Sequence, residues 1–211
     1  MDPNVLAVKT YDVIAEKYAK QFTHPSKHID AFLSFILKGK RILDVGCGVG
    51  VDAGYMVTKG FQVVAVDLSA KMVEIAKKQF PNVDFRQGDM RTLTFDDECF
   101  SGVLVAHSLI HIPKRELPKM LRHLWRFLAG GGVAYFVMLV GKSEEVFLPE
   151  PLERDELTFL NIVSVEEFTR LMQETGFKLV KKWIKKEVDV GQPNFETCFF
   201  LAVKRQLNAT V

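Results

Sequence analysis

An acidic residue, Asp44, is followed by three glycines at every second position in the stretch ILDVGCGVGVDAGY, residues 42–55. The glycines, Gly46, Gly48 and Gly50, allow a tight backbone turn that approaches a ligand without a Cβ in the way. A dinucleotide-binding turn needs its third small residue at position 51, which is valine here. Asp44 would also repel a pyrophosphate, because both are negatively charged. The pattern therefore favours a ligand with a cationic end, although the glycines alone are equally consistent with a sharp turn.

Two further acids follow predicted strands. Asp67 closes the apolar run FQVVAVD at 61–67, and a carboxylate at that place can accept two hydrogen bonds from ribose hydroxyls. Asp89 lies in QGDM after the next strand, where it could accept a hydrogen bond from an adenine amino group while Met90 covers the ring. A helix cap or a turn is the alternative role for each acid.

Strands and helices alternate along the chain and must position these residues. Apolar runs predict strands at 41–45, 61–67, 82–87, 102–107 and 133–139. Two last strands are predicted at 177–187 and 197–204, joined by a turn around Gly191 and Pro193. Helical spacing and capping signals predict helices at 5–22, 29–37, 51–59, 70–79, 117–128 and 164–176. This order predicts an α/β fold with a doubly wound, mostly parallel seven-stranded sheet that ends in an antiparallel hairpin.

Five motifs together resemble a known family. They are DVGCGVG at 44–50, VDLSAKM at 66–72, QGDM at 87–90, FSGVLVAHSLIHI at 100–112 and LAGGGVAYF at 128–136. In order and spacing they are similar to the class I S-adenosylmethionine-dependent methyltransferases, over about residues 9–205. The resemblance is highly specific for the cofactor and poorly specific for the substrate.

The resemblance implies a Rossmann-like methyltransferase fold and S-adenosyl-L-methionine as the cofactor. The residues implied to bind it are Asp44, Gly46, Cys47, Gly48, Gly50, Asp67, Leu68, Met72, Asp89, Met90, Ala106 and His107, with Tyr11 and Tyr18 from a helical lid. Asp44 and the glycine loop would hold the methionine part, Asp67 the ribose, and Leu68 with Met72 the adenine faces. Ala106 and His107 would lie beside the sulfonium.

The same resemblance implies a single domain in four segments. These are an N-terminal helical lid at 1–38, a cofactor-binding core at 39–140, an insertion over the active site at 141–163, and a C-terminal helix and hairpin at 164–211. Residues 141–163 fit neither the helical nor the strand period, and so long a loop is usually functional or mobile.

Two histidines after the strand at 102–107 are the candidate catalytic residues, because histidine titrates near neutral pH. His111 is the candidate general base, and His107 stands beside it in the sequence. Structural packing with a bond to a backbone carbonyl is the alternative for both. Their spacing of four would suit a metal on a helix, but no third ligand is visible, so no metal is expected. For Tyr11 and Tyr18, filling the core is as good an explanation as contact with the ligand.

Composition narrows the function classes. The chain has 211 residues, of which 48% are hydrophobic and 26% charged, with a net charge of +2. That charge is too low to favour nucleic-acid binding, and no apolar run approaches the roughly 20 residues that cross a membrane. Three distant cysteines and the absence of a secretory signal predict a cytoplasmic protein, monomeric or homodimeric.

The sequence therefore predicts a methyltransferase that acts on an O, N or C atom of a small metabolite. A regulatory or scaffold protein that binds S-adenosylmethionine without catalysis stays open as the alternative, because its binding loop would look the same.

Overall fold

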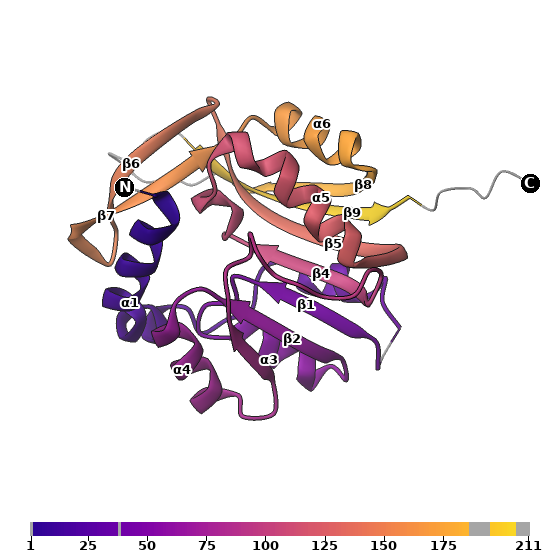
Figure 1. Cartoon of the computed structure of the whole chain (residues 1–211), viewed down its shortest axis with the longest axis horizontal. Helices are drawn as coiled ribbons and strands as arrows, with labels where there is room; N and C mark the ends of the chain where they lie inside the picture. Colours follow the sequence, from indigo (N-terminus) through magenta and orange to yellow (C-terminus); the bar gives the residue numbers. More distant parts are fainter. Residues whose placement is uncertain (1, 38, 186–194, 206–211) are drawn as a thin grey trace, which may run out of the picture.

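The computed structural model of the chain describes residues 2–37, 39–185 and 195–205 (Figure 1). The strands are β1 (Arg41–Val45), β2 (Gln62–Asp67), β3 (Asp84–Gln87), β4 (Phe100–Ala106), β5 (Leu128–Gly141), β6 (Glu144–Glu150), β7 (Glu153–Ile162), β8 (Phe177–Lys185) and β9 (Phe195–Lys204). The helices are α1 (Pro3–Gln21), α2 (Ile29–Leu33), α3 (Val51–Thr58), α4 (Ala70–Gln79), α5 (Leu117–Phe127) and α6 (Val165–Thr175), with short 3₁₀ turns η1 (Leu109–His111) and η2 (Lys114–Glu116).

Seven strands form one sheet in the order β3-β2-β1-β4-β5-β9-β8. β3, β2, β1, β4 and β5 are paired in parallel, whereas β9 pairs antiparallel with both β5 and β8. The predicted doubly wound, mostly parallel sheet with a C-terminal hairpin is therefore confirmed. The chain order reverses between β1 and β4, and the crevice beyond the carboxyl ends of two such strands is where ligands bind in this class of sheet.

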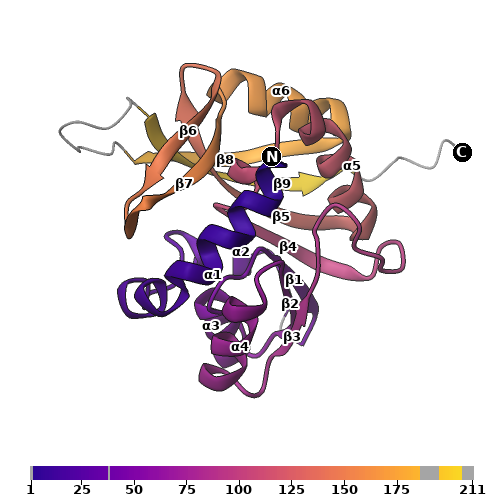
Figure 2. The ribbon, with the colours of Figure 1, turned by 60° about the vertical axis from the view of Figure 1, so that its left-hand side comes forward.

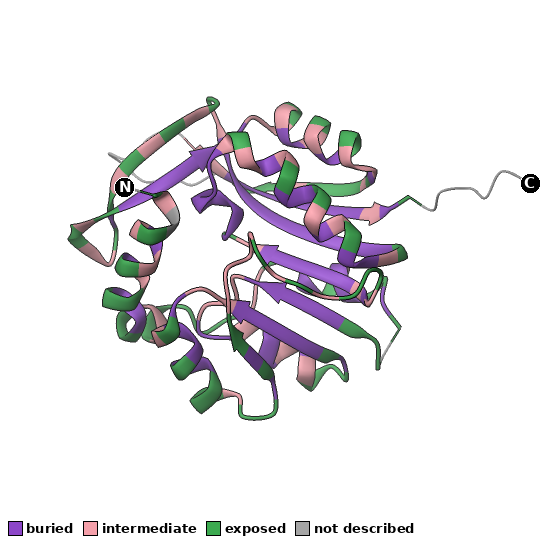
Figure 3. Cartoon of the chain, in the orientation of Figure 1, coloured by how far each residue is buried: buried purple, intermediate pink, exposed green. Residues whose placement is uncertain are grey.

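Side chains of β1, β2, β4, β5 and β9 alternate between two apolar layers, one on each face of the sheet. Most of the length of these strands is buried (Figure 3). Leu43 and Val45 of β1 face the layer covered by α5 and α6, where Met120 and Phe168 are buried. Ile42 faces the opposite layer, covered by α2, α3 and α4. The same alternation places Asp44 of β1 on the α2–α4 side, at the carboxyl end of the strand.

Helix α1 runs past the carboxyl ends of the strands, between α4 on one side and the hairpin β6–β7 on the other (Figure 2). On the hairpin side, Thr10 Oγ1 donates a hydrogen bond of 2.9 Å to the carbonyl of Leu157. On the α4 side, the carboxylate of Asp12 accepts a bond from the hydroxyl of Ser69, the N-cap residue of α4. The helix is thus attached to both halves of the molecule.

Residues 141–163 differ most from what their sequence pattern suggested. They form the antiparallel hairpin β6–β7, in which Leu148 pairs with Thr158. The second strand lacks the alternation typical of a half-exposed strand because its residues 158–162 are all buried. Two smaller differences are that β5 begins already at Leu128, beside a bulge in β4, and that α2 ends at Leu33. The turn predicted around Gly191 and Pro193 lies outside the described residues.

Helix α6 offers a test of the predicted capping signal. The Ser164 hydroxyl accepts the backbone N–H of Glu167 at 3.0 Å, and the Glu167 carboxylate accepts the backbone N–H of Ser164 in return. We expect Ser164→Ala to lower the free energy of unfolding by about 1 kcal/mol, measured by urea denaturation. Thr169→Ala, in the middle of the same helix, is the matched control and should change it by less than about 0.5 kcal/mol. Equal effects would show that the cap does not stabilise α6.

Candidate active site

A cavity beyond the carboxyl ends of β1, β2 and β4 gathers most of the predicted site residues. This central cavity is lined by Tyr11, Tyr18, Gly46, Gly48, Asp67, Leu68, Met72, Met90, Ala106, His107 and His111. A neighbouring cleft is lined by Asp44, Cys47 and Asp52, together with Tyr18, Gly48 and His107. The chain topology thus brings together side chains from α1, the glycine turn, β2, α4 and the segment after β4.

The three glycines of the turn have different surroundings. Gly48 has a φ of 53°, and a Cβ placed there would meet only the Tyr18 ring, at 3.7 Å. Its N–H donates to Asp67 Oδ2 at 2.8 Å, which joins the turn to the end of β2. Gly50 lines neither cavity; a Cβ there would lie 2.5 Å from the Phe85 ring. Gly48 therefore keeps open space on the ligand side, whereas Gly50 allows close packing behind the turn.

Asp44 carries an unsatisfied negative group inside the protein. It is 1% exposed, and among the described residues its Oδ2 has no hydrogen-bond partner. Burial raises the pKa of its carboxyl, and the neighbouring acids Asp52 and Asp67 raise it further. A buried carboxylate without a cation is costly, because burial weakens its hydration and no described residue forms an ion pair with Asp44 to compensate for this. The cleft is therefore suited to a cationic group.

Asp67 is better satisfied than Asp44. Its two oxygens accept the backbone N–H groups of Gly48 and Ser69, at 2.8 and 2.9 Å. Burial raises the pKa of the Asp67 carboxyl, and these two bonds partly offset that effect. Each carboxylate oxygen has a second lone pair, so Asp67 retains acceptor capacity toward the cavity that it lines.

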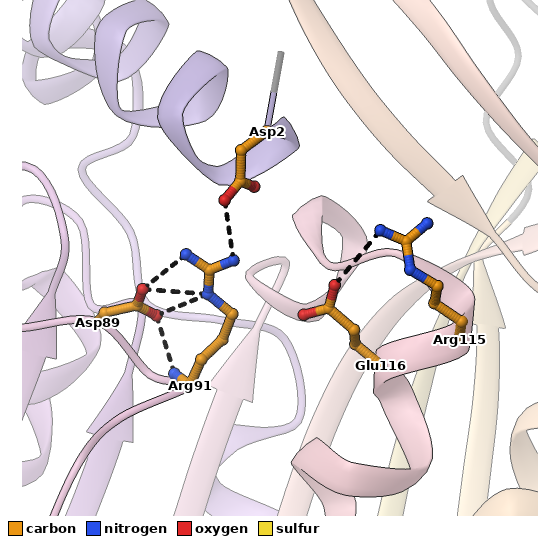
Figure 4. A network of polar contacts seen from close by, with 5 residues as sticks. All are labelled: Asp2, Asp89, Arg91, Arg115 and Glu116. Atoms are coloured by element: carbon orange, nitrogen blue, oxygen red, sulfur yellow. Dashed lines mark hydrogen bonds and ion pairs between the residues drawn. The ribbon is translucent and has the colours of Figure 1, made fainter.

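Asp89 is not brought to the central cavity. Both of its oxygens accept bonds from the Arg91 guanidinium, and one also accepts the backbone N–H of Arg91 at 2.8 Å. Arg91 in turn pairs with Asp2, just ahead of α1, at 3.1 Å (Figure 4). Met90, which stands between Asp89 and Arg91 in the sequence, does line the cavity. Asp89 thus joins the loop after β3 to the beginning of the chain.

Tyr11 and His111 form a hydrogen-bonded pair where α1 meets η1. The Tyr11 hydroxyl lies 2.9 Å from Nε2 of His111, and Nδ1 lies 3.0 Å from the carbonyl of Phe159. A carbonyl can only accept, so Nδ1 carries the proton and donates it. Burial lowers the pKa of His111 to about 4, so its ring is neutral at pH 7 and Nε2 accepts the Tyr11 O–H. The arrangement leaves the Tyr11 oxygen free to accept a proton from a molecule in the cavity.

His107 occupies an uncommon backbone conformation at the end of β4. Its φ is 55°, in the left-handed region that non-glycine residues rarely adopt, and its N–H donates to the carbonyl of Val137 at 3.1 Å. Such backbone strain costs about 1–3 kcal/mol and is concentrated at functional sites. The side chain lines both the central cavity and the neighbouring cleft.

Four residues that the sequence did not single out also line the central cavity. Ala7 and Val8 come from α1, Ser69 from the start of α4, and Ser108 from the segment after β4. Ser108 is 7% exposed, and its hydroxyl donates to the carbonyl of Val45 at 2.7 Å. Small apolar and hydroxyl residues carry no chemical signal of their own; only their position in the fold shows that they belong to the site.

Comparisons with known proteins agree with this geometry. Residues 42–132 match the family described as "Methyltransferase domain". The demethylmenaquinone methyltransferase of Renibacterium salmoninarum is 37% identical over 86 residues, which are 40% of this chain and 36% of that protein. The ubiquinone biosynthesis O-methyltransferase of Coxiella burnetii is 26% identical over 187 residues, covering 77% and 78% of the two chains. A solved SAM-dependent methyltransferase structure from Methanosarcina mazei has a TM-score of 0.75 at 16% identity, covering 86% and 99%.

Residues 42–132 of this chain match a methyltransferase domain family, and the comparisons support a class I S-adenosylmethionine-dependent methyltransferase. The chain spans between 28% and 56% of the length of five of the curated relatives that it matches. Over the described residues, no cluster of three or more His, Cys, Asp or Glu side chains could hold a metal ion. Within the same residues no helix is both long and apolar enough to span a membrane.

S-adenosylmethionine is the cofactor of this methyltransferase family, and the residues present fit it. Its methionine end carries an ammonium group, which matches the unpartnered oxygen of Asp44. Its ribose offers hydroxyl donors to the remaining acceptor capacity of Asp67, and the open side of Gly48 leaves room for a ligand against the backbone. The donor set of the methyltransferase domain is thus complementary in charge to this cofactor.

The low pKa of His111 predicts a pH dependence of stability. In the folded protein His111 has a pKa of about 4, whereas in the unfolded chain its pKa is 6.5, so the folded state takes up the proton only at a lower pH. Its contribution to stability is complete above about pH 6.5 and is lost as the pH falls toward 4. Between pH 7 and pH 5 we expect the wild type to lose about 2 kcal/mol more unfolding free energy than His111→Gln, measured by urea titration. Parallel losses in the two proteins would contradict a neutral, buried imidazole.

Proposed function

We propose that this protein transfers a methyl group from S-adenosylmethionine to an O, N or C atom of a small metabolite by in-line displacement. The observation that carries the proposal is that two neighbouring pockets share part of their lining. The central cavity and an outer pocket under the hairpin β6–β7 share Tyr11, Tyr18, His107 and His111 as lining residues. A cofactor in one space and an acceptor in the other would meet at these four side chains.

The cofactor would be held by the residues that the sequence pattern singled out. Asp44 would bind the ammonium group, Asp67 the ribose hydroxyls, and Leu68 with Met72 the adenine faces. Tyr18 lines all three of these spaces. Burial and the neighbouring Asp67 and Asp52 raise the pKa of its hydroxyl, so it stays protonated and could donate to the methionine carboxylate. Met90 would cover the adenine edge. Asp89 would not contact the adenine itself but would hold the loop that carries Met90, because its oxygens are bonded to Arg91.

The residues of the chain would contribute to the chemistry by positioning the two reactants and by accepting a proton. When bound, the cofactor supplies an electrophilic methyl group on a positively charged sulfur, which leaves as a neutral thioether. Tyr11 would accept the proton of an O–H or N–H nucleophile while passing its own proton to Nε2 of His111. A base with a pKa of about 4 is weak, so this relay suits a proton that leaves only as the nucleophile attacks.

Helix α1 would serve as the lid of the site. Tyr11 and Tyr18 of this helix are half-buried and line the cavity, and orientation of two reactants in such a site can supply roughly 7–11 kcal/mol of the barrier. The lid would also restrict the site to small acceptors, because α1 and the hairpin β6–β7 contact each other over it.

Two measurements test the proposed function. S-adenosylhomocysteine should bind the purified protein in calorimetry, and it should accumulate when a metabolite extract is added together with S-adenosylmethionine. Binding without accumulation would favour a regulatory or scaffold protein, and no binding at all would reject the proposal.

Asp44→Asn separates cofactor binding from folding. The substitution removes a buried charge that has no cation in the ligand-free protein, so the variant should be at least as stable as the wild type in urea. It should bind S-adenosylhomocysteine about tenfold or more weakly, because a charge-assisted hydrogen bond is worth roughly 1.5–3 kcal/mol. Asp84→Asn, which removes an exposed acid paired with Arg86, is the matched control and should bind normally. Unchanged affinity in Asp44→Asn would remove Asp44 from the site.

Tyr11→Phe and His111→Gln test the proton relay. Each should lower kcat by about 100-fold or more while changing the affinity for S-adenosylhomocysteine by less than about threefold. Because the two side chains act as one relay, the double variant should be hardly slower than either single variant. Additive losses in steady-state kinetics would argue against a shared proton path.

A further inference from the structure

The outer pocket is mostly apolar but contains one acid. Leu139, Leu148 and Leu160 line it, together with Phe195 from β9. Glu150, at the end of β6, is the one acidic residue among its described lining residues, and neither lysine nor arginine occurs among them. The pocket therefore has an apolar wall and a single negative group.

The described residues offer the Glu150 carboxylate no ion pair. Glu150 is 8% exposed, and none of the ion pairs among those residues involves it. Lys17 of α1 pairs with Glu153, at 2.7 Å. The only hydrogen bond to its carboxylate among the described residues is a long one, 3.5 Å from the N–H of Leu152. Burial raises the pKa of Glu150 accordingly, and its charge also raises the pKa of Tyr11 across the pocket.

A second polar group in the same wall lacks a partner. Thr158 of β7 lines the pocket, is 3% exposed, and its Oγ1 has no hydrogen-bond partner among the described residues. Thr158 pairs across the hairpin with Leu148 of β6. Leu148 stands two residues before Glu150 on the same strand. Buried polar groups are normally bonded, so an unpaired hydroxyl and a carboxylate with one long hydrogen bond in the same pocket indicate a ligand that satisfies them.

We propose that Glu150 and Thr158 bind a protonated amino group of the methyl acceptor, so that the substrate is a small amine with an apolar body. This inference rests on the proposed methyltransferase function and names its substrate class. A carboxylate stabilises the ammonium form, whose nitrogen has no lone pair with which to attack a methyl group. The amino group at Glu150 is therefore a recognition group, and a second O or N atom of the same molecule faces Tyr11.

The pocket also excludes other acceptors. Acceptors bearing a phosphate or carboxylate at this end would meet Glu150 with no described lysine or arginine in the lining to offset the repulsion. Two of the similar proteins are named phosphoethanolamine N-methyltransferases, so this chain is expected to differ from them in its acceptor.

Three matched probes test the inference by binding rather than by turnover. Tyramine, 4-(2-hydroxyethyl)phenol and 3-(4-hydroxyphenyl)propanoate share a phenol and differ in a cationic, neutral or anionic end. With the protein saturated with S-adenosylhomocysteine, we expect tyramine to bind at least about tenfold more tightly than the neutral probe, and the anionic probe most weakly. Phosphoethanolamine should not compete with tyramine.

Glu150→Gln keeps the shape of the side chain and removes its charge. In this variant the tenfold preference for tyramine should fall to less than about twofold, while the affinity for S-adenosylhomocysteine stays unchanged. Glu144→Gln, an acid at the other end of β6 that is not among the lining residues, should keep the full preference. The inference is overturned if the neutral or anionic probe binds as well as tyramine, if no probe binds, or if the preference survives in Glu150→Gln. Failure to bind S-adenosylhomocysteine would instead overturn the proposed function.

Discussion

Negative charge buried at the carboxyl ends of β1 and β2 is the constraint on which the site depends. Asp52 and Asp67 both raise the pKa of Asp44, and among the described residues Asp52 and Asp67 accept hydrogen bonds whereas Oδ2 of Asp44 accepts none. Such an arrangement is unfavourable in an empty protein and favourable around a cation. The glycine turn leaves room for a ligand there, because the N–H of Gly48 donates to Asp67 while Gly48 has no side chain to fill the space beside it.

Helix α1 turns an open edge of the sheet into an enclosed site. Helix α1 contacts α4 on one side and β7 on the other, so the same helix covers both the cofactor region and the hairpin. Tyr11 lies at this junction and belongs to both spaces. Because the same helix closes both, we expect cofactor binding and acceptor binding to be coupled through the order of α1.

The functional residues of the acceptor side come from segments without a strong motif. Glu150 and Thr158 lie within residues 141–163, whose pattern fits no regular period because α1 and η1 cover the inner strand of the hairpin. Asp89 shows the opposite case: its motif was clear, yet Arg91 binds both of its oxygens and holds them away from the central cavity. A motif identifies residue types at a strand end, but competing local partners decide where each side chain points.

The sequence pattern was enough to predict the alternating strands and helices, the sheet class and the position of the glycine turn, because burial and backbone conformation repeat with fixed local periods. It also indicated Asp44 and Asp67, since the carboxyl ends of neighbouring parallel strands must meet. The pairing of Tyr11 with His111, and the absence of an ion pair to Glu150 among the described residues, could be found only from the three-dimensional fold. These facts depend on contacts between segments 100 or more residues apart, such as Tyr11 with His111, whose geometry no local pattern encodes.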